Sequence, residues 1–177
     1  MTERILDPRP SPAGRAGRAL LRTVGLHPDD ARRAPRKVPD ARALVVASSH
    51  GVLDIGVATG VFASELTVPY YVFQDAGLAV DVASIKGGIV PVDPLSMKEA
   101  IRSADDDRML ADPRLRAQLM DALPIAKLDF AAYDIVFLAG GWGAAFDFGQ
   151  SDVLARRMSE ACAAGRNAGA ACAPARA

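Results

Sequence analysis

The sequence has few of the features that mark disulfide-built, membrane-spanning or nucleic-acid-binding proteins. It contains only two cysteines, Cys162 and Cys172, which are too few for a disulfide scaffold. No apolar run reaches the roughly 18 residues of a transmembrane helix, and the N-terminus lacks the apolar core of a secretory signal. Basic and acidic residues number 21 each, so no charge excess indicates a nucleic acid or an anionic membrane as partner. These absences predict a cytoplasmic protein.

The chain divides by composition into two regions. Half of its 177 residues are hydrophobic, which is enough for one domain with a sizeable core. Residues 1–40 hold six of the twelve prolines and nine basic against five acidic residues. We expect this segment to be a basic, partly disordered arm around a short helix over 18–24; the alternative to a solvated arm is a nucleic-acid or membrane contact. Residues 41–177 form the predicted folded domain.

One stretch organises this domain. Ile135 to Leu138 is a short apolar run without polar alternation, typical of a strand buried on both faces of a parallel sheet. Gly140, Gly141 and Gly143 follow directly. Ligands of open α/β sheets bind just past the carboxyl ends of strands, where glycines let backbone N–H groups point outward. The loop is predicted to be either an anion or oxyanion cradle or a tight turn without a ligand.

A second buried strand, Leu44 to Ala47, leads to another group of polar residues. Ser48, Ser49 and His50 come at its carboxyl end. His50 is a candidate base or ligand; the alternative is a hydrogen-bonded loop histidine. With further strands over 78–84 and 168–172 and helical stretches between them, the order predicts a mostly parallel three-layer α/β fold.

Glu65 stands just before a predicted helix. Leu66, Tyr70 and Phe73 recur at helical spacing, and Pro69 fits the first turn of that helix. A carboxylate near a helix N-terminus is favoured by the exposed N–H groups, and burial among apolar neighbours would raise its pKa. The alternative is an ordinary surface glutamate.

Three smaller predictions concern the second half of the chain. Ser96 and Glu99 have the spacing of a capping box, which predicts a helix ending near Ala104. Residues 105–107 are three aspartates that lack the alternating spacing of a calcium loop, so we expect a solvated turn without metal. Cys162 is expected to be a small buried residue on the inner face of a helix.

From residue 42 onward the sequence resembles the ThiJ/PfpI branch of the class I glutamine-amidotransferase-like superfamily. Within it, the most similar subgroup is that of stress-induced chaperones and glutathione-independent glyoxalases. The resemblance rests on six motifs in the family's order: TGVFASE at 59–65, PYYVFQDAG at 69–77, SIKGG at 84–88, DPLS at 93–96, YDIVFLAGG at 133–141 and FDF at 146–148.

This resemblance implies a flavodoxin-like sandwich and a set of site residues. By position, Cys172 matches the family's nucleophile and Glu65 its glutamate. The oxyanion loop of the family matches the segment made of Gly140, Gly141, Trp142 and Gly143.

The resemblance also implies an activity. The cysteine attacks methylglyoxal-like 2-oxoaldehydes to give lactate, as part of a stress response, without metal, glutathione or other cofactor. The implied partners are a small aldehyde substrate and a second copy in a homodimer.

Three departures from the family pattern keep other functions open. Ala173 follows the cysteine where the family usually has histidine, and Trp142 stands where the loop histidine is usual. The chain also ends at Ala177, so the domain is expected to be incomplete at its C-terminus. The alternatives are a catalytically inactive family remnant or a chaperone-like protein. Amide transfer from glutamine is a weaker third, because it needs a histidine–glutamate pair from the part after Ala177.

Overall fold

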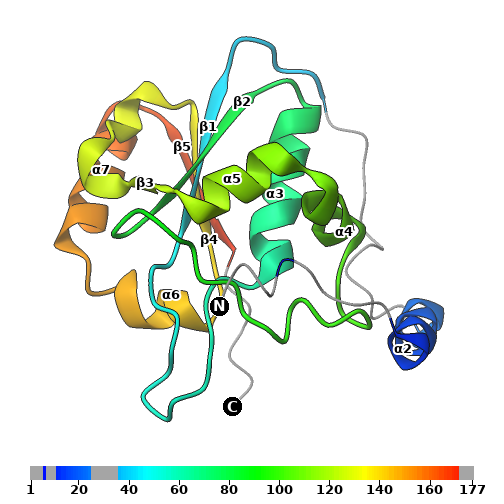
Figure 1. Ribbon diagram of the computed structural model, residues 1–177. Coiled ribbons are helices and arrows are strands. Elements are labelled where there is room, and N and C mark those ends of the chain that lie inside the picture. Colours follow the sequence, from blue (N-terminus) through cyan, green and yellow to red (C-terminus); the bar gives the residue numbers. More distant parts are fainter. Residues whose placement is uncertain (1–5, 7–10, 25–35, 172–177) are drawn as a thin grey trace.

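A five-stranded parallel sheet with helices on both faces forms the body of the protein (Figure 1). The computed structural model describes residue 6 and residues 11–24 and 36–171. Residues 170 and 171 are described by their backbone alone. Neighbouring strands are parallel throughout, in the order β3-β2-β1-β4-β5. This confirms the predicted mostly parallel α/β sandwich. The strands are β1 Arg42–Ala47, β2 Ala79–Ser84, β3 Leu123–Pro124, β4 Ile135–Ala139 and β5 Asn167–Ala171.

The helices cover the sheet from two sides. In Figure 1, α3, α4 and α5 lie over one face and α7 over the other, while α2 lies apart at the edge of the molecule. No helix in the described ranges combines the length and apolar character required to cross a membrane. The helices are α2 Pro12–Thr23, α3 Ala63–Asp75, α4 Ala104–Ala111, α5 Pro113–Met120, α6 Trp142–Asp147 and α7 Asp152–Ala163, with 3₁₀ helices η2 Ile125–Lys127 and η3 Phe130–Ala132.

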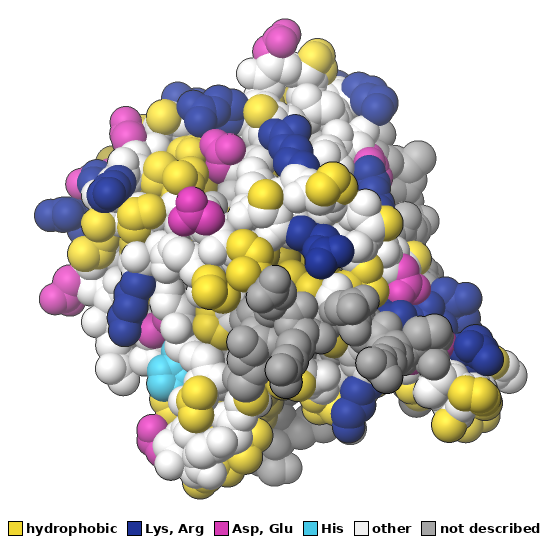
Figure 2. Space-filling view, viewed as in Figure 1, with side chains coloured by type: hydrophobic (Ala, Val, Ile, Leu, Met, Phe, Trp, Pro, Cys, Tyr) yellow, Lys and Arg dark blue, Asp and Glu magenta, His cyan; other side chains and the backbone are white. Residues whose placement is uncertain are grey.

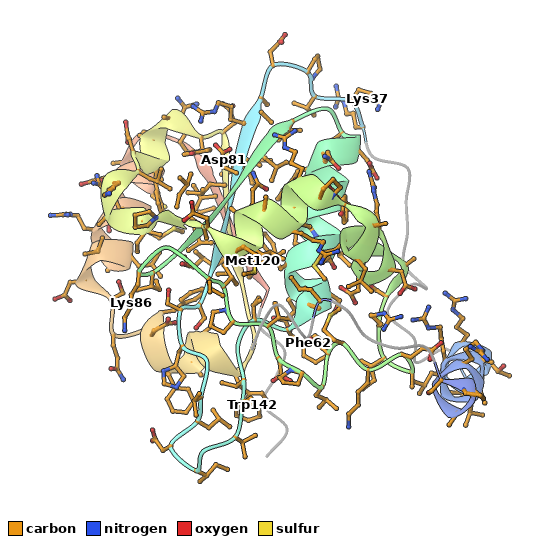
Figure 3. The ribbon with its side chains drawn as sticks, viewed as in Figure 1. Lys37, Phe62, Asp81, Lys86, Met120 and Trp142 are labelled. Atoms are coloured by element: carbon orange, nitrogen blue, oxygen red, sulfur yellow. The ribbon has the colours of Figure 1, made fainter. Side chains whose placement is uncertain are left out.

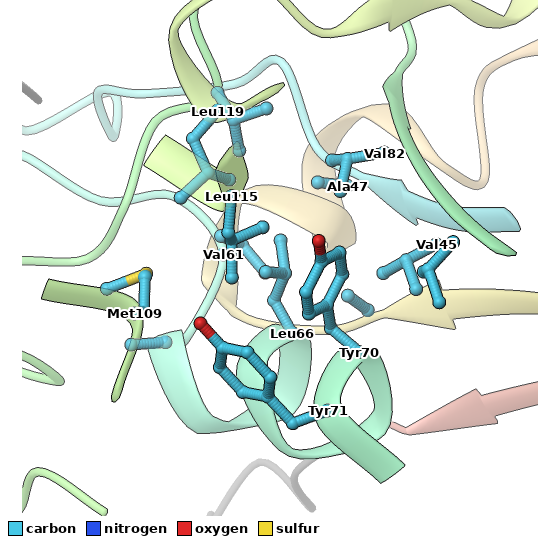
Figure 4. Close-up of a cluster of buried hydrophobic side chains, with 14 of the residues drawn as sticks. Val45, Ala47, Val61, Leu66, Tyr70, Tyr71, Val82, Met109, Leu115 and Leu119 are labelled. Atoms are coloured by element: carbon cyan, nitrogen blue, oxygen red, sulfur yellow. The ribbon is translucent and has the colours of Figure 1, made fainter. Parts of the chain in front are cut away.

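Strand β1 is buried on both faces, as its continuous apolar sequence predicted. Leu44 and Val46 pack into the cluster beneath α7, which includes Leu154. Val45 points the other way, into the larger cluster that contains Tyr70 of α3 (Figure 4). All five side chains are at most 4% exposed. Because successive side chains of a strand alternate between its faces, β1 joins the two halves of the core.

Helix α3 begins earlier than its apolar spacing predicted. It starts at Ala63, so Pro69 lies inside the helix, and the prediction of Pro69 in the first turn was wrong. Proline has no N–H to donate to the carbonyl of Glu65 four residues before it. The helix nevertheless starts there because the Phe62 N–H donates to the Gly140 carbonyl at 3.1 Å, which fixes the chain where it enters the first turn. Glu65 lies in that first turn, as expected.

The predicted capping box at Ser96 was also wrong. The Ser96 hydroxyl donates to the Asp93 carbonyl at 2.6 Å, and residues 95–101 form turns. Glu99 is occupied elsewhere, because its carboxylate accepts from the Ser11 N–H at the start of α2. The capping box is instead formed by Ser103 and Asp106 at the start of α4.

The three aspartates at 105–107 lie in the first turn of α4, so the prediction of a solvated turn was wrong. Asp106 is buried and accepts from the Thr67 hydroxyl of α3 at 2.5 Å. Burial raises the pKa of Asp106, and the hydrogen bonds from Thr67 and Ser103 partly offset this. Asp107 accepts from Arg18 at 2.6 Å and Arg102 at 2.7 Å. The first of these ion pairs holds α2 against the body of the domain.

Cys162 is exposed, so the prediction of a buried role was wrong. Helix α7 begins with Ser151 as its cap and buries Leu154 and Ala161. Cys162 follows Ala161 and is turned away from that face, because successive helical residues are about 100° apart.

We expect Thr67→Val to lower the free energy of unfolding by about 1–3 kcal/mol, because it leaves a buried oxygen of Asp106 without its donor. Urea unfolding monitored by circular dichroism would measure this. Thr23→Val on the exposed end of α2 is the matched control, with an expected change within about 0.5 kcal/mol. Equal effects of the two substitutions would mean that the Thr67–Asp106 hydrogen bond does not couple α3 to α4.

Candidate active site

The candidate site lies where the connections of the sheet change direction. From β1 the chain continues to β2 on one side, whereas β4 lies on the other side of β1. In open parallel sheets such a switch point leaves a crevice at the carboxyl ends of the two strands. Residues 48–50 follow β1 and residues 140–143 follow β4, so the structure brings the two predicted loops together.

The glycine loop is held against the segment that leads into α3. Gly140 accepts from the Phe62 N–H at 3.1 Å, and the Gly143 N–H donates to the Gly60 carbonyl at 3.2 Å. Between them, Gly141 has a φ of 132°, and a Cβ placed there would lie 2.5 Å from both Gly60 O and Phe62 N. Only glycine permits this backbone conformation and this close approach.

Glu65 is carried to the same place by α3. Its N–H donates to the Phe62 carbonyl at 2.9 Å, within the first helical turn. Its side chain is partly buried. Figure 3 labels Phe62 and Trp142 on the two neighbouring segments at this end of the sheet. The structure therefore brings the predicted glutamate and the predicted oxyanion loop to one location.

Helix α6 is fastened to the end of β1 by a residue that the sequence analysis did not select. Asp147 accepts from the Ser49 N–H at 2.7 Å and from the Ser48 hydroxyl at 3.1 Å. One helical turn earlier, a Cβ on Gly143 would lie 2.7 Å from the same Ser48 hydroxyl and 2.6 Å from the His50 carbonyl. The i, i+4 spacing of Gly143 and Asp147 places both on one helix face, and this is the signal that could have found Asp147.

His50 lies against α6. Its ring stacks on Phe146 with centroids 4.6 Å apart and an interplanar angle of 5°. The backbone N–H of His50 donates to the Ser48 hydroxyl at 2.9 Å. The Nε2 atom is buried and has no hydrogen-bond partner within the described part of the chain. Each imidazole nitrogen can take part in a hydrogen bond, so this buried Nε2 is, among the described residues, the unpartnered polar atom of His50.

Trp142 is the first residue of α6 and lies between the two close-packed glycines. Its N–H is at the helix start, where helical amides have no intrahelical acceptor, whereas the Gly143 N–H already donates to Gly60. Its indole is 56% exposed. Among the described residues, no three or more His, Cys, Asp or Glu side chains are grouped so as to hold a metal ion.

The predicted nucleophile, Cys172, lies outside the described residues, as do Ala173 and Ala177. The last described residue, Ala171, ends β5 and pairs with Ala139 of β4. Ala139 is followed at once by Gly140. The residue before Cys172 and the residue before the glycine loop are therefore register partners.

We expect Gly143→Ala to destabilise the protein by about 1–3 kcal/mol, because the added methyl group would overlap Ser48 and the His50 carbonyl. Thermal unfolding would measure the loss. Gly149→Ala is the matched control, since a Cβ at Gly149 meets no atom within 4 Å. Indistinguishable melting curves for the two variants would contradict a close contact between α6 and the end of β1.

A family model and a curated relative match this chain. The model of the DJ-1/PfpI family matches residues 53–176. The glutathione-independent glyoxalase hsp3101 of Schizosaccharomyces pombe is 33% identical over 111 residues, which cover 61% of this chain and 46% of that protein. The chain thus spans about half the length of this relative.

Solved structures agree with this assignment. Rapid Encystment Protein 24 KDa of Francisella tularensis is 31% identical, with a TM-score of 0.68, over 73% of this chain and 57% of that one. Glyoxalase III from Candida albicans, at 24% identity and a TM-score of 0.65 over 73% and 56% of the two chains, shares the fold. Because the family model matches well over half of its residues, this chain belongs to the DJ-1/PfpI family, as its ThiJ/PfpI motifs predicted.

Proposed function

We propose that this protein is a cysteine-dependent, glutathione-independent glyoxalase or deglycase that converts methylglyoxal-like 2-oxoaldehydes to 2-hydroxy acids such as lactate. The observation that carries the proposal is the hydrogen-bonded contact between the glycine loop and Phe62 at the start of α3, which joins the loop to the helix of Glu65. The name of the similar Schizosaccharomyces pombe protein supports the same reaction.

The proposed nucleophile is the thiolate of Cys172, the residue after β5. Its sulfur bonds to the aldehyde carbon, and the carbonyl oxygen takes up a proton to give a hemithioacetal. A base removes the proton from that carbon, and a proton returns to the neighbouring carbon, which leaves a thioester of the 2-hydroxy acid. Water hydrolyses the thioester and regenerates the thiol, so no oxidant is needed.

The remaining roles follow from charge and proton movement. The N–H groups of Gly141 and Trp142 are proposed to stabilise the oxyanion that forms when the thiolate attacks. Glu65, at the start of α3, is proposed to hydrogen-bond the thiol and move a proton. Ala173 supplies no imidazole, so we assign the missing base to His50, whose Nε2 has no partner among the described residues.

The proposal includes a small aldehyde as substrate, a homodimer and a cytoplasmic location. In the sheet formed by the described residues, β5 pairs with β4 on one side, and its other edge would favour pairing of two copies.

We expect the purified chain to consume methylglyoxal and release lactate without glutathione, and Cys172→Ala to abolish this turnover. Cys162→Ser is the matched control and should leave the rate unchanged, because Cys162 is an exposed residue of α7. Lactate measured by an enzyme-coupled assay would follow both variants. A folded wild-type chain without turnover would reject catalysis and favour the alternative of an inactive family remnant or a chaperone-like protein.

We expect His50→Phe to lower kcat about 10²- to 10⁴-fold, because it removes the proposed base. Phenylalanine retains a flat ring to stack on Phe146, so the melting temperature should change little. Steady-state kinetics beside thermal unfolding would separate the two effects. An unchanged kcat would exclude His50 as the base.

A further inference from the structure

The only tryptophan of the chain has an exposed side chain in the middle of the glycine loop. On one side of it Gly141 is packed against Gly60, and on the other side Gly143 is packed against Ser48. These contacts hold the backbone on both sides of Trp142, whose side chain is exposed. The ring is therefore turned outward, directly beside the N–H groups assigned to the oxyanion.

Residues 51–59 form a hairpin that connects the two segments in contact with the glycine loop. The Thr59 N–H donates to the Gly51 carbonyl at 3.0 Å at its base, and Leu53 donates to Val57 at 2.8 Å nearer its tip. Gly51 follows His50, and Thr59 precedes Gly60. The base of the hairpin is thus adjacent in sequence to both segments that contact the glycine loop.

This hairpin exposes apolar side chains on both faces. Val52 pairs with Ala58 and Val57 lies opposite Leu53, so the two valines point to opposite sides. They are 51% and 52% exposed. Each side of the hairpin therefore carries one exposed valine. In Figure 2 the lobe at the bottom of the view, which is the hairpin of Figure 1, carries separate hydrophobic side chains at its edges, and a histidine lies above it.

An exposed apolar surface beside a polar reaction site indicates a place where an apolar part of a ligand binds. The methyl group of methylglyoxal would cover little of the indole. A phenyl ring or a longer alkyl chain covers far more, and aromatic pairs gain a further contribution from stacking.

We propose that Trp142, with the base of the hairpin, forms an apolar subsite that selects 2-oxoaldehydes carrying an aromatic or long alkyl group over methylglyoxal. This proposal rests on the proposed glyoxalase function, because it takes the reacting aldehyde to lie at the glycine loop. It names a substrate class that the family motifs do not specify, since Trp142 stands where the family usually has histidine.

The test compares the two products, so that it does not depend on turnover. Addition of water to methylglyoxal gives lactate, and addition of water to phenylglyoxal gives mandelate; both products carry the same 2-hydroxy carboxylate. We expect mandelate to bind the purified chain about tenfold more tightly than lactate. Because Trp142 is the only tryptophan, its fluorescence reports binding at the subsite itself.

Variants measured by calorimetry identify the residue responsible. Trp142→Ala should reduce the mandelate-to-lactate affinity ratio to about one, and Trp142→Phe should keep most of it, because phenylalanine also stacks. Ile55→Ser is the matched control: Ile55 is 80% exposed but lies at the tip of the hairpin, so its loss should leave the ratio unchanged.

Several outcomes would overturn the subsite. These are equal affinities of the wild-type chain for the two products, no binding of either, or a ratio that Trp142→Ala leaves intact. A loss of the ratio in Ile55→Ser would also overturn it, since the whole hairpin would then act as a docking surface. A mandelate preference without turnover would keep the subsite and reject the proposed catalysis, whereas turnover with equal kcat/KM for both aldehydes would reject the subsite alone.

Discussion

The close contact between the glycine loop and the chain entering α3 is the constraint on which the rest of the site depends. Two backbone hydrogen bonds join Gly140 and Gly143 to residues 60–62, and they form only because Gly141 has no side chain. The contact determines where α3 begins and so where Glu65 lies. It also leaves the N–H of Trp142 at a free helix start, because the neighbouring amide of Gly143 is already used.

Strand β1 holds α6, the helix that follows the glycine loop, in place. It is buried on both faces, and its carboxyl end is tied to α6 by the hydrogen bonds of Asp147 to Ser48 and Ser49. The end of β1 and residues 60–62 are therefore both held to the segment 140–147, which contains the glycine loop and α6. Buried polar contacts such as Thr67 with Asp106 hold α4 against α3, so the helix of Glu65 is fixed at its outer side as well.

Family membership and the residues of this chain answer different questions. The DJ-1/PfpI match identifies the fold and the order of the elements. The sequence departs from the family pattern at two positions, with Trp142 in the glycine loop and Ala173 after the cysteine. One departure introduces an apolar surface at the proposed reaction site, and the other leaves His50 as the nearby imidazole. Both effects come from individual side chains on a backbone that the family shares.

The sequence by itself determined the elements whose signals are local: the buried strands, the glycine loop, the helix of Glu65 and the family motifs. Only the tertiary structure decided the elements that depend on distant partners. Asp106 is buried against the Thr67 hydroxyl of α3, and Asp107 is paired with Arg18 of α2 and with Arg102. Glu99 serves α2 and not Ser96, and α3 extends back past Pro69 because Gly140 holds Phe62. Asp147 gained its role in the same way, because a carboxylate on a short helix reveals its hydrogen-bond donors only when the end of β1 is folded against it.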